Sequence, residues 1–311
     1  MNFLERIQSV QSPELAARVE TRWNSLTKPP GSLGQLEALV LRLALMQQTA
    51  RPSMARKAMA IFCGDHGVVA EGVSAYPSEV TVQMVRNFVR GGAAISVLCR
   101  KHGIEPAIVD TGVAGDPEPG TIDMRIGRGT ANFAAGPAMT AAQAGKALQI
   151  GAALAAAWKH RFDVAGVGEM GIGNTTSASA LLCAFTGIEP NAAAGPGAGL
   201  DAPGMLRKCA VIEAGLRLHR EAIESQDPVA IAAAVGGFEI VTMAGFMLGA
   251  AEARLPVVVD GFIASSAALV ARAIAPTVLD YLIFSHFSAE PAHRAMLAAL
   301  GAQAVLSLDM R

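Results

Sequence analysis

A glycine-rich stretch from Phe162 to Thr176 carries the residues whose types and spacing suit chemistry best. An apolar run breaks into a loop with glycine at 166, 168, 171 and 173, and an alanine-rich helix follows from about Ser177. Such glycines let the backbone approach a ligand, and the N–H groups at a helix start favour an anion such as phosphate. A carboxylate repels phosphate, so we expect Glu169 to face another part of the ligand. The alternative is a plain strand-to-helix turn with glycines for packing.

A second glycine-rich loop, Gly195 to Asp201, lies shortly downstream. Two such loops can hold one phosphate from two sides, although a flexible linker between helices has the same composition. Lys208 follows early in the next helix and is able to reach a phosphate as a point charge. A solvated helix lysine is the ordinary alternative.

The loop from Gly72 to Thr81 places Ser74 and Tyr76 before a helix, in a chain with two tyrosines. This mixture of hydroxyls and one ring suits a flat apolar ligand. A capped helix start at Ser78 explains the same residues, and both interpretations can hold together.

The elements that must position these loops alternate between apolar strands and helices, which predicts a parallel α/β sheet. Helices are expected at 81–88, 93–101 and 140–158, the last with Thr140 and Gln143 at capping-box spacing. Six strands are expected at 58–63, 106–109, 162–167, 256–259, 279–284 and 304–308.

Polar residues follow each of these strands. They are Asp65 and His66, Asp110, Glu169, Asp260, His286 with Glu290, and Asp309. Because the carboxyl ends of parallel strands share one edge of the sheet, we expect these side chains to surround one cleft. Acidic helix caps explain any single one of them. A catalytic pair of His66 and His286 is possible but has no visible nucleophile beside it.

Before the first strand, residues 1–25 and 35–49 are expected to be helical, with Ser12 and Pro13 at a helix start. The irregular segment from Thr27 to Gly34 separates the two helices. The long apolar window from Val229 to Glu252 is interrupted by two glycines and Glu239, so we expect a buried helix and no membrane span.

The composition excludes several function classes. A net charge of −1, with no run of either sign, argues against nucleic-acid binding. The four cysteines are far apart among apolar neighbours, so we expect reduced core thiols and no zinc. The P-loop and dinucleotide fingerprints are missing, and no targeting segment is visible, which favours a cytoplasmic enzyme.

Eight segments occur in an order that resembles the nicotinate-nucleotide:dimethylbenzimidazole phosphoribosyltransferase family over nearly the whole chain. They are Lys28 to Gly34, Gly64 to Gly67, Tyr76-Pro77, Gly91 to Ile95, Gly168 to Thr176, Gly236 to Glu239, Asp260 to Phe262, and Ser288 to Pro291. The resemblance implies transfer of phosphoribose from nicotinate mononucleotide to 5,6-dimethylbenzimidazole, giving α-ribazole 5′-phosphate and nicotinate for the lower ligand of cobalamin. It implies no cofactor and no metal.

The resemblance also implies an architecture. We expect an open, mostly parallel six-stranded α/β sheet flanked by helices, a small helical domain built from both chain ends, and a homodimer. The corresponding ranges are 1–50 for the first part of the small domain, 51–290 for the large domain, and 291–311 for a last helix and a strand that completes the large-domain sheet.

By position, the resemblance places Glu169 and Asp260 in the nucleotide site, and we expect these carboxylates to be catalytic because they can stabilise the oxocarbenium character that develops as the glycosidic bond breaks. Residues expected to bind the nucleotide are Gly171, Ile172, Gly173, Asn174, Thr175, Gly197, Gly199, Lys208 and Ser288. Ser74, Tyr76 and Gln83 are expected to face the benzimidazole. The resemblance implies a glutamate as general base, which is expected after Arg311. One alternative is therefore a nucleotide-binding protein without turnover, and a second is a nucleosidase, in which water replaces the benzimidazole.

Overall fold

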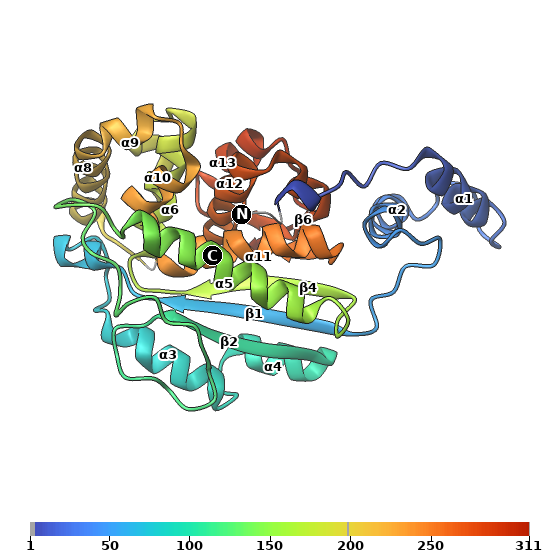
Figure 1. Ribbon diagram of the computed structural model, residues 1–311, viewed down its shortest axis with the longest axis horizontal. Coiled ribbons are helices and arrows are strands. Elements are labelled where there is room, and N and C mark those ends of the chain that lie inside the picture. Colours follow the sequence, from blue (N-terminus) through green and yellow to red (C-terminus); the bar gives the residue numbers. More distant parts are fainter. Residues whose placement is uncertain (1–3, 198, 311) are drawn as a thin grey trace.

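Figure 1 shows the computed structural model, which describes residues 4–197 and 199–310. A twisted sheet lies between two helical layers, with α3 and α4 on one face and α5 and α11 on the other. The strands are β1 Lys57–Gly64, β2 Ile104–Gly112, β3 Ile122–Asp123, β4 Val164–Met170, β5 Val257–Val259, β6 Leu282–Phe284, β7 His286–Ser288 and β8 Leu306–Met310.

Helices connect the strands and cover the sheet. Their bounds are α1 Pro13–Asn24, α2 Gln35–Gln47, α3 Glu79–Val89, α4 Ala94–His102, α5 Ala141–Trp158, α6 Asn174–Thr186, α7 Pro190–Ala193, α8 Ala202–Leu218, α9 Arg220–Glu224, α10 Pro228–Val235, α11 Phe238–Ala253, α12 Phe262–Ile274 and α13 His293–Leu300. Short 3₁₀ turns lie at Leu4–Arg6, Gly67–Glu71 and Pro276–Tyr281.

The described residues form a main sheet of six strands in the order β3-β2-β1-β4-β5-β6, and every pair is parallel. This confirms the expected fold class. The strand order reverses between β1 and β4, which makes their carboxyl ends the point where ligands bind in open α/β sheets. Cys63 of β1 pairs with Asp110 on one side and Met170 on the other, so the loops after these strands start at one level.

One strand prediction is wrong. The strand expected at 304–308 forms as β8, but it pairs with β7 in a separate two-stranded sheet. Ser285 separates β6 from β7, and β8 pairs with β7, so β8 does not complete the main sheet. The sixth strand is the two-residue β3, which has no periodic pattern to reveal it.

Local sequence explains the helices well. The Ser12 side chain accepts from the Leu15 N–H, and Thr140 with Gln143 forms the predicted capping box. The apolar window after Val229 forms two helices, α10 and α11, because Gly236 and Gly237 interrupt it. Every residue of α11 except Glu252 is buried. Within the described ranges, no helix is both long and apolar enough to cross a membrane.

The N-terminal helices form a small unit with its own core of Leu15, Val19 and Ala44, and they project beyond the sheet (Figure 1). Contacts tie α2 to the starts of strands: Arg42 donates to the Leu282 carbonyl, and Gln47 donates to the carbonyl of Asp163, just before β4. This unit therefore lies at the amino edge of the sheet. At the other end of the chain, α13 and β8 pack on α12 and β7.

Candidate functional site

Two adjoining cavities lie at the carboxyl edge of the sheet. One, of about 330 Å³, is lined by residues after β4, β5 and β6, and the other, of about 280 Å³, by the loop after β4 and by segment 73–75. Glu169, Thr175, Gly197 and Ile263 line both, so they form a shared wall. The arrangement can hold one ligand that extends from one cavity into the other.

The loop after β4 owes its path to two glycines. A Cβ on Gly171 would lie 2.2 Å from the carbonyl oxygen of Gly64, so β1 and the loop approach too closely for any side chain. Gly173 has a φ of +92°, in the left-handed region, and immediately precedes α6. The N–H of Ile172 donates to the Thr81 hydroxyl, which anchors the loop on α3. The start of α6 is thereby held at the shared wall.

Lys208 is fully buried beneath this wall, and the interpretation of a solvated helix lysine is wrong. Its Nζ lies 2.9 Å from the Thr175 hydroxyl and 2.8 Å from the Gly195 carbonyl oxygen, so it joins the two glycine-rich loops. Burial lowers the pKa of Lys208 to about 8, and the Glu290 carboxylate opposes that shift. The interaction of α8 with α6 thus places a cation next to the helix start.

Glu290 holds the second loop from the other side. Its Oε1 accepts from the Gly197 N–H at 3.0 Å, and the side chain packs so closely on Gly195 that no Cβ fits there. The Oε2 atom of Glu290 is buried without a hydrogen-bond partner among the described residues. The motif after β6 contained this glutamate, but nothing in the sequence connected it to a loop 93 residues away.

Most of the predicted site residues line the two cavities. They are Ser74, Glu169, Gly171, Ile172, Gly173, Asn174, Thr175, Gly197, Asp260 and Ser288. Tyr76, Gln83 and Gly199 are exposed and lie outside both linings. Residue 198 of the second loop lies outside the described residues.

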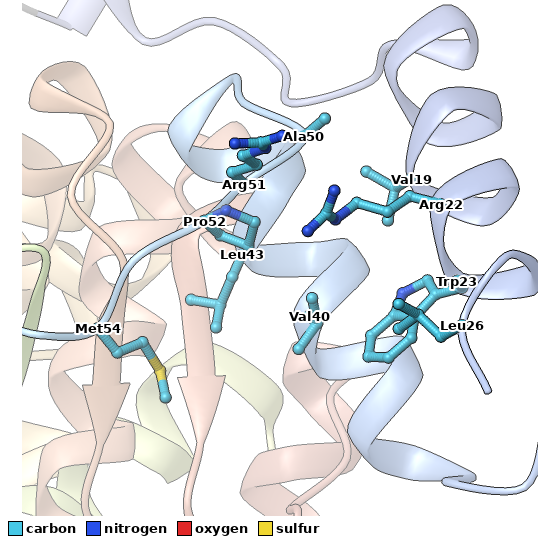
Figure 2. Close-up of a pocket in the computed structure, with 10 residues that line it drawn as sticks. All are labelled: Val19, Arg22, Trp23, Leu26, Val40, Leu43, Ala50, Arg51, Pro52 and Met54. Carbon is cyan, nitrogen blue, oxygen red and sulfur yellow. The ribbon is translucent and has the colours of Figure 1, made fainter. Parts of the chain in front are cut away.

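A third cavity, of about 370 Å³, lies between α1, α2 and segment 50–54 (Figure 2). Figure 2 shows Val40 and Leu43 of α2 opposite Trp23 of α1 and Leu26 just after it, with two arginines at the rim. Its lining contains no carboxylate and no histidine, and it draws on none of the strand ends. It is therefore an apolar groove and not a second reaction site.

Comparison with known proteins identifies the family. A profile described as "Phosphoribosyltransferase" matches residues 8–311. The chain belongs to this phosphoribosyltransferase family. Relatives of this chain are named nicotinate-nucleotide–dimethylbenzimidazole phosphoribosyltransferase. One, from Ralstonia nicotianae, is 50% identical over 96% of this chain and 85% of the relative. Another, from Solidesulfovibrio magneticus, is 48% identical over 93% of this chain and 82% of the relative. A crystal structure of the enzyme of that name from Thermus thermophilus superposes with a TM-score of 0.88 at 44% identity, covering 96% of this chain and 89% of that one.

In this phosphoribosyltransferase the carboxyl group of Glu169 has an unusual environment. Burial raises its pKa to about 8, with further contributions from the charges of Glu239 and Asp260, and a hydrogen bond from the Asn174 amide opposes the shift. A pKa near the working pH lets one group exist in both protonation states during a reaction cycle.

Asp260 follows β5 and faces the first cavity. Its side chain is 55% exposed, yet the surrounding protein displaces enough water to raise its pKa, an effect of burial that nearby His286 opposes. The Nδ1 atom of His286 lies 3.6 Å from Asp260 Oδ1 and 2.8 Å from the Ser285 hydroxyl. His286 therefore lies beside Asp260 in the first cavity.

A buried trio that the sequence did not assign lies directly behind the loop. His66 Nε2 is 2.6 Å from Glu239 Oε1, and His66 Nδ1 is 3.0 Å from the Ser177 hydroxyl. All three side chains are buried and line neither cavity. His66 and His286 thus have separate partners, and the pair considered from the sequence does not form.

Glu239 was visible in the sequence as a charge within an apolar window. Its role follows from the structure, in which α11 begins against the end of β1 and the Glu239 carboxylate raises the pKa of Glu169. Across residues 4–197 and 199–310, no group of three or more His, Cys, Asp or Glu side chains is placed to hold a metal ion.

Proposed function

We propose that this phosphoribosyltransferase moves the phosphoribosyl group of nicotinate mononucleotide to 5,6-dimethylbenzimidazole, forming α-ribazole 5′-phosphate and nicotinate. The observation that carries the proposal is the pair of cavities with one shared wall, where a helix start and a buried lysine adjoin two carboxyl groups. Relatives at 45–50% identity carry the name of this reaction.

The phosphate is expected at the start of α6, between Thr175 and Gly197. Backbone N–H groups and the helix dipole favour an anion there, and Lys208 supplies a full positive charge from below. Ser288 lines the same cavity and offers a hydroxyl. Binding energy at the phosphate then orients the ribose for reaction.

The ribose is expected between Glu169 and Asp260. As the bond from C1′ to the nicotinate nitrogen breaks, its electron pair neutralises the pyridinium ring, and positive charge develops on the sugar. An ionised carboxylate beside C1′ stabilises that charge. The pyridinium ring of the bound substrate is itself cationic, so its arrival favours the ionised form of Glu169.

The incoming benzimidazole is expected in the second cavity, beside Ser74. One ring nitrogen attacks C1′ with its lone pair, on the face opposite the leaving group, and the proton on the other nitrogen passes to a base. Tyr76, Gln83 and Gly199, which are exposed outside both cavity linings, remain proposed contacts to the substrates.

Nicotinate release tests the reaction class. We expect the full-length gene product to release nicotinate from nicotinate mononucleotide when dimethylbenzimidazole is present and to release little without it. Equal release in both conditions would indicate a nucleosidase. Binding by calorimetry with no release would indicate a nucleotide-binding protein without turnover.

We further propose that the protein acts in the cytoplasm as a homodimer. The apolar groove between α1 and α2 supports this assembly, because Leu26 and Met54, which line it, are about half exposed (Figure 2). A second copy of the chain is the partner that we expect to cover it.

A further inference from the structure

A chain of hydrogen bonds joins two walls of the Asp260 cavity through a buried histidine. His293, at the start of α13, is 1% exposed, and both of its ring nitrogens have partners. The N–H of Ser288 donates to Nδ1 at 2.9 Å, and Nε2 lies 3.0 Å from the Ser265 hydroxyl. That hydroxyl lies 2.7 Å from the carbonyl oxygen of Gly261. The chain therefore runs from β7 to the start of α12.

The direction of every bond in this chain is determined. A backbone N–H can only donate, so Nδ1 of His293 must carry a lone pair and Nε2 must carry the proton. Nε2 then donates to Ser265, and the Ser265 hydroxyl donates to the Gly261 carbonyl, which can only accept. Burial, and the neighbouring His286, lower the pKa of His293 to about 4, so the ring stays neutral at neutral pH.

Both ends of this series of hydrogen bonds belong to the candidate site. Ser288 and Gly261 line the first cavity, and Gly261 is the residue directly after Asp260. The φ of Gly261 is +20°, at the margin of the left-handed region, so the turn that places the Asp260 carboxylate is not held by ordinary backbone preference. The Gly261 carbonyl accepts the first backbone hydrogen bond of α12, from the Ser265 N–H at 3.2 Å, and the Ser265 hydroxyl adds a side-chain restraint that connects the turn to His293.

We propose that His293 is a positioning residue, which fixes the Asp260-Gly261 turn relative to Ser288 through Ser265. His293 lines neither cavity and acts only through these neighbours. The inference rests on the proposed function, in which Asp260 faces the ribose and Ser288 the phosphate. A single buried imidazole then sets the distance between the two substrate contacts.

The imidazole ¹⁵N spectrum tests the chain without any assay of activity. We expect His293 in the full-length protein, labelled with ¹⁵N-histidine, to show a protonated Nε2 and an unprotonated Nδ1 from pH 7 down to pH 5. The signal is assigned by its loss in His293→Asn. A protonated Nδ1, or an imidazolium at pH 7, would overturn the proposal because neither can accept from the Ser288 N–H.

Kinetics test the positioning role. In His293→Asn we expect kcat/KM for nicotinate mononucleotide to fall about 10- to 100-fold, while KM for dimethylbenzimidazole stays unchanged because that base binds beyond Glu169. Ser265→Ala breaks the same series of hydrogen bonds, so kcat/KM of the double variant for nicotinate mononucleotide should be only slightly lower than that of the more impaired single variant. His219→Asn is the matched control, since His219 is a part-buried histidine on the Phe133 carbonyl, away from the cavities, and we expect wild-type kinetics from it.

Losses that multiply in the double variant, or an equal rise in both KM values, would show general damage to the fold and would contradict the positioning role. Circular dichroism and urea denaturation establish that each variant is folded before it is assayed. If the wild-type protein makes no product, the proposed function fails, and the imidazole spectrum still decides the existence of the hydrogen-bond chain.

Discussion

Glu169 shows how strongly the surrounding fold changes the properties of a single residue. The sequence placed it beside a predicted phosphate loop, where a carboxylate did not fit. In the structure it lies on the wall shared by two cavities, and burial together with Glu239 and Asp260 raises its pKa to about 8. The sequence could not predict this value, because Glu239 lies 70 positions away and approaches only through the packing of α11.

Replacing Glu169 by Gln should reduce activity and increase stability. We expect kcat to fall at least 100-fold with the fold retained, because the variant cannot stabilise positive charge on the sugar. Wild-type turnover would remove Glu169 from the chemistry.

A raised pKa means that the folded protein prefers the protonated acid, so wild-type stability falls as pH rises from about 4.5 to about 8. Gln does not ionise, so at pH 8.5 the free energy of unfolding of the variant should exceed that of the wild type by on the order of 2 kcal/mol, measured by urea denaturation.

Lys208 should make phosphate binding depend on pH. Its pKa of about 8 means that the ammonium is largely present at pH 7 and largely lost at pH 9, whereas ribose 5-phosphate, a phosphate monoester with a second pKa of about 6, remains largely a dianion. Calorimetry should show the affinity for ribose 5-phosphate falling about tenfold over this range. The fall should persist in Glu169→Gln, which removes the other group of similar pKa, and disappear in Lys208→Met together with most of the binding. Binding independent of pH in the wild type would contradict the placement of phosphate at Lys208.

At the scale of elements, the close packing of α5 on α11 depends on glycines. A Cβ on Gly245 of α11 would lie 2.2 Å from the carbonyl oxygen of Leu148 on α5, and one on Gly151 of α5 would lie 2.0 Å from that of Thr242. The two helices form the layer behind β1 and β4 (Figure 1), and α11 also carries Glu239. The spacing of this layer therefore fixes the depth at which Glu239 lies behind Glu169.

Gly245→Ala should separate the two helices and destabilise the protein by about 2–3 kcal/mol, measured by urea denaturation. Gly145→Ala is the matched control on α5, because a Cβ there meets nothing within 4 Å. We expect the control to stabilise the protein by about 0.5–1 kcal/mol through helix propensity. Equal effects in the two variants would show that contact between the helices is not the cause.

The predictability of elements follows from the strength of their local signals. Caps at Ser12 and Thr140 and the long apolar strands were readable, so most of the expected helices and five of the main strands were predicted correctly. The helix expected over residues 1–25 instead begins at Pro13, after a short 3₁₀ turn, and the one expected in the apolar window divides into α10 and α11. The strand β3 has two residues and forms only because β2 offers a free edge, which no local pattern reveals. The carboxyl-edge cleft was predictable because it follows from parallel strands, whereas the buried contacts of Lys208 and His293 depend on packing between distant segments.

For the whole molecule, the candidate site and the N-terminal helices lie at opposite edges of the sheet. The cavities adjoin the carboxyl ends of β4, β5 and β6, whereas α2 is tied to the amino-terminal starts of β4 and β6. The groove on α1 and α2 is therefore free to meet a second copy without covering the site of its own chain. This separation is consistent with the proposed homodimer.

The protein should sediment as a dimer at micromolar concentration, and Leu26→Glu should shift it toward the monomer by placing a charge in the apolar groove. Leu218→Glu is the control, since Leu218 is a similarly exposed leucine at the end of α8. A monomeric wild type would contradict the assembly, and equal dissociation by both variants would move the interface away from the groove.

The formation of α-ribazole 5′-phosphate tests the central claim most directly. The full-length gene product is incubated with nicotinate mononucleotide and 5,6-dimethylbenzimidazole, and both products are quantified by chromatography and mass spectrometry. The two-cavity site predicts α-ribazole 5′-phosphate and nicotinate in equal amounts, with a large loss in Glu169→Gln. No α-ribazole 5′-phosphate, under conditions in which nicotinate mononucleotide binds, would contradict it.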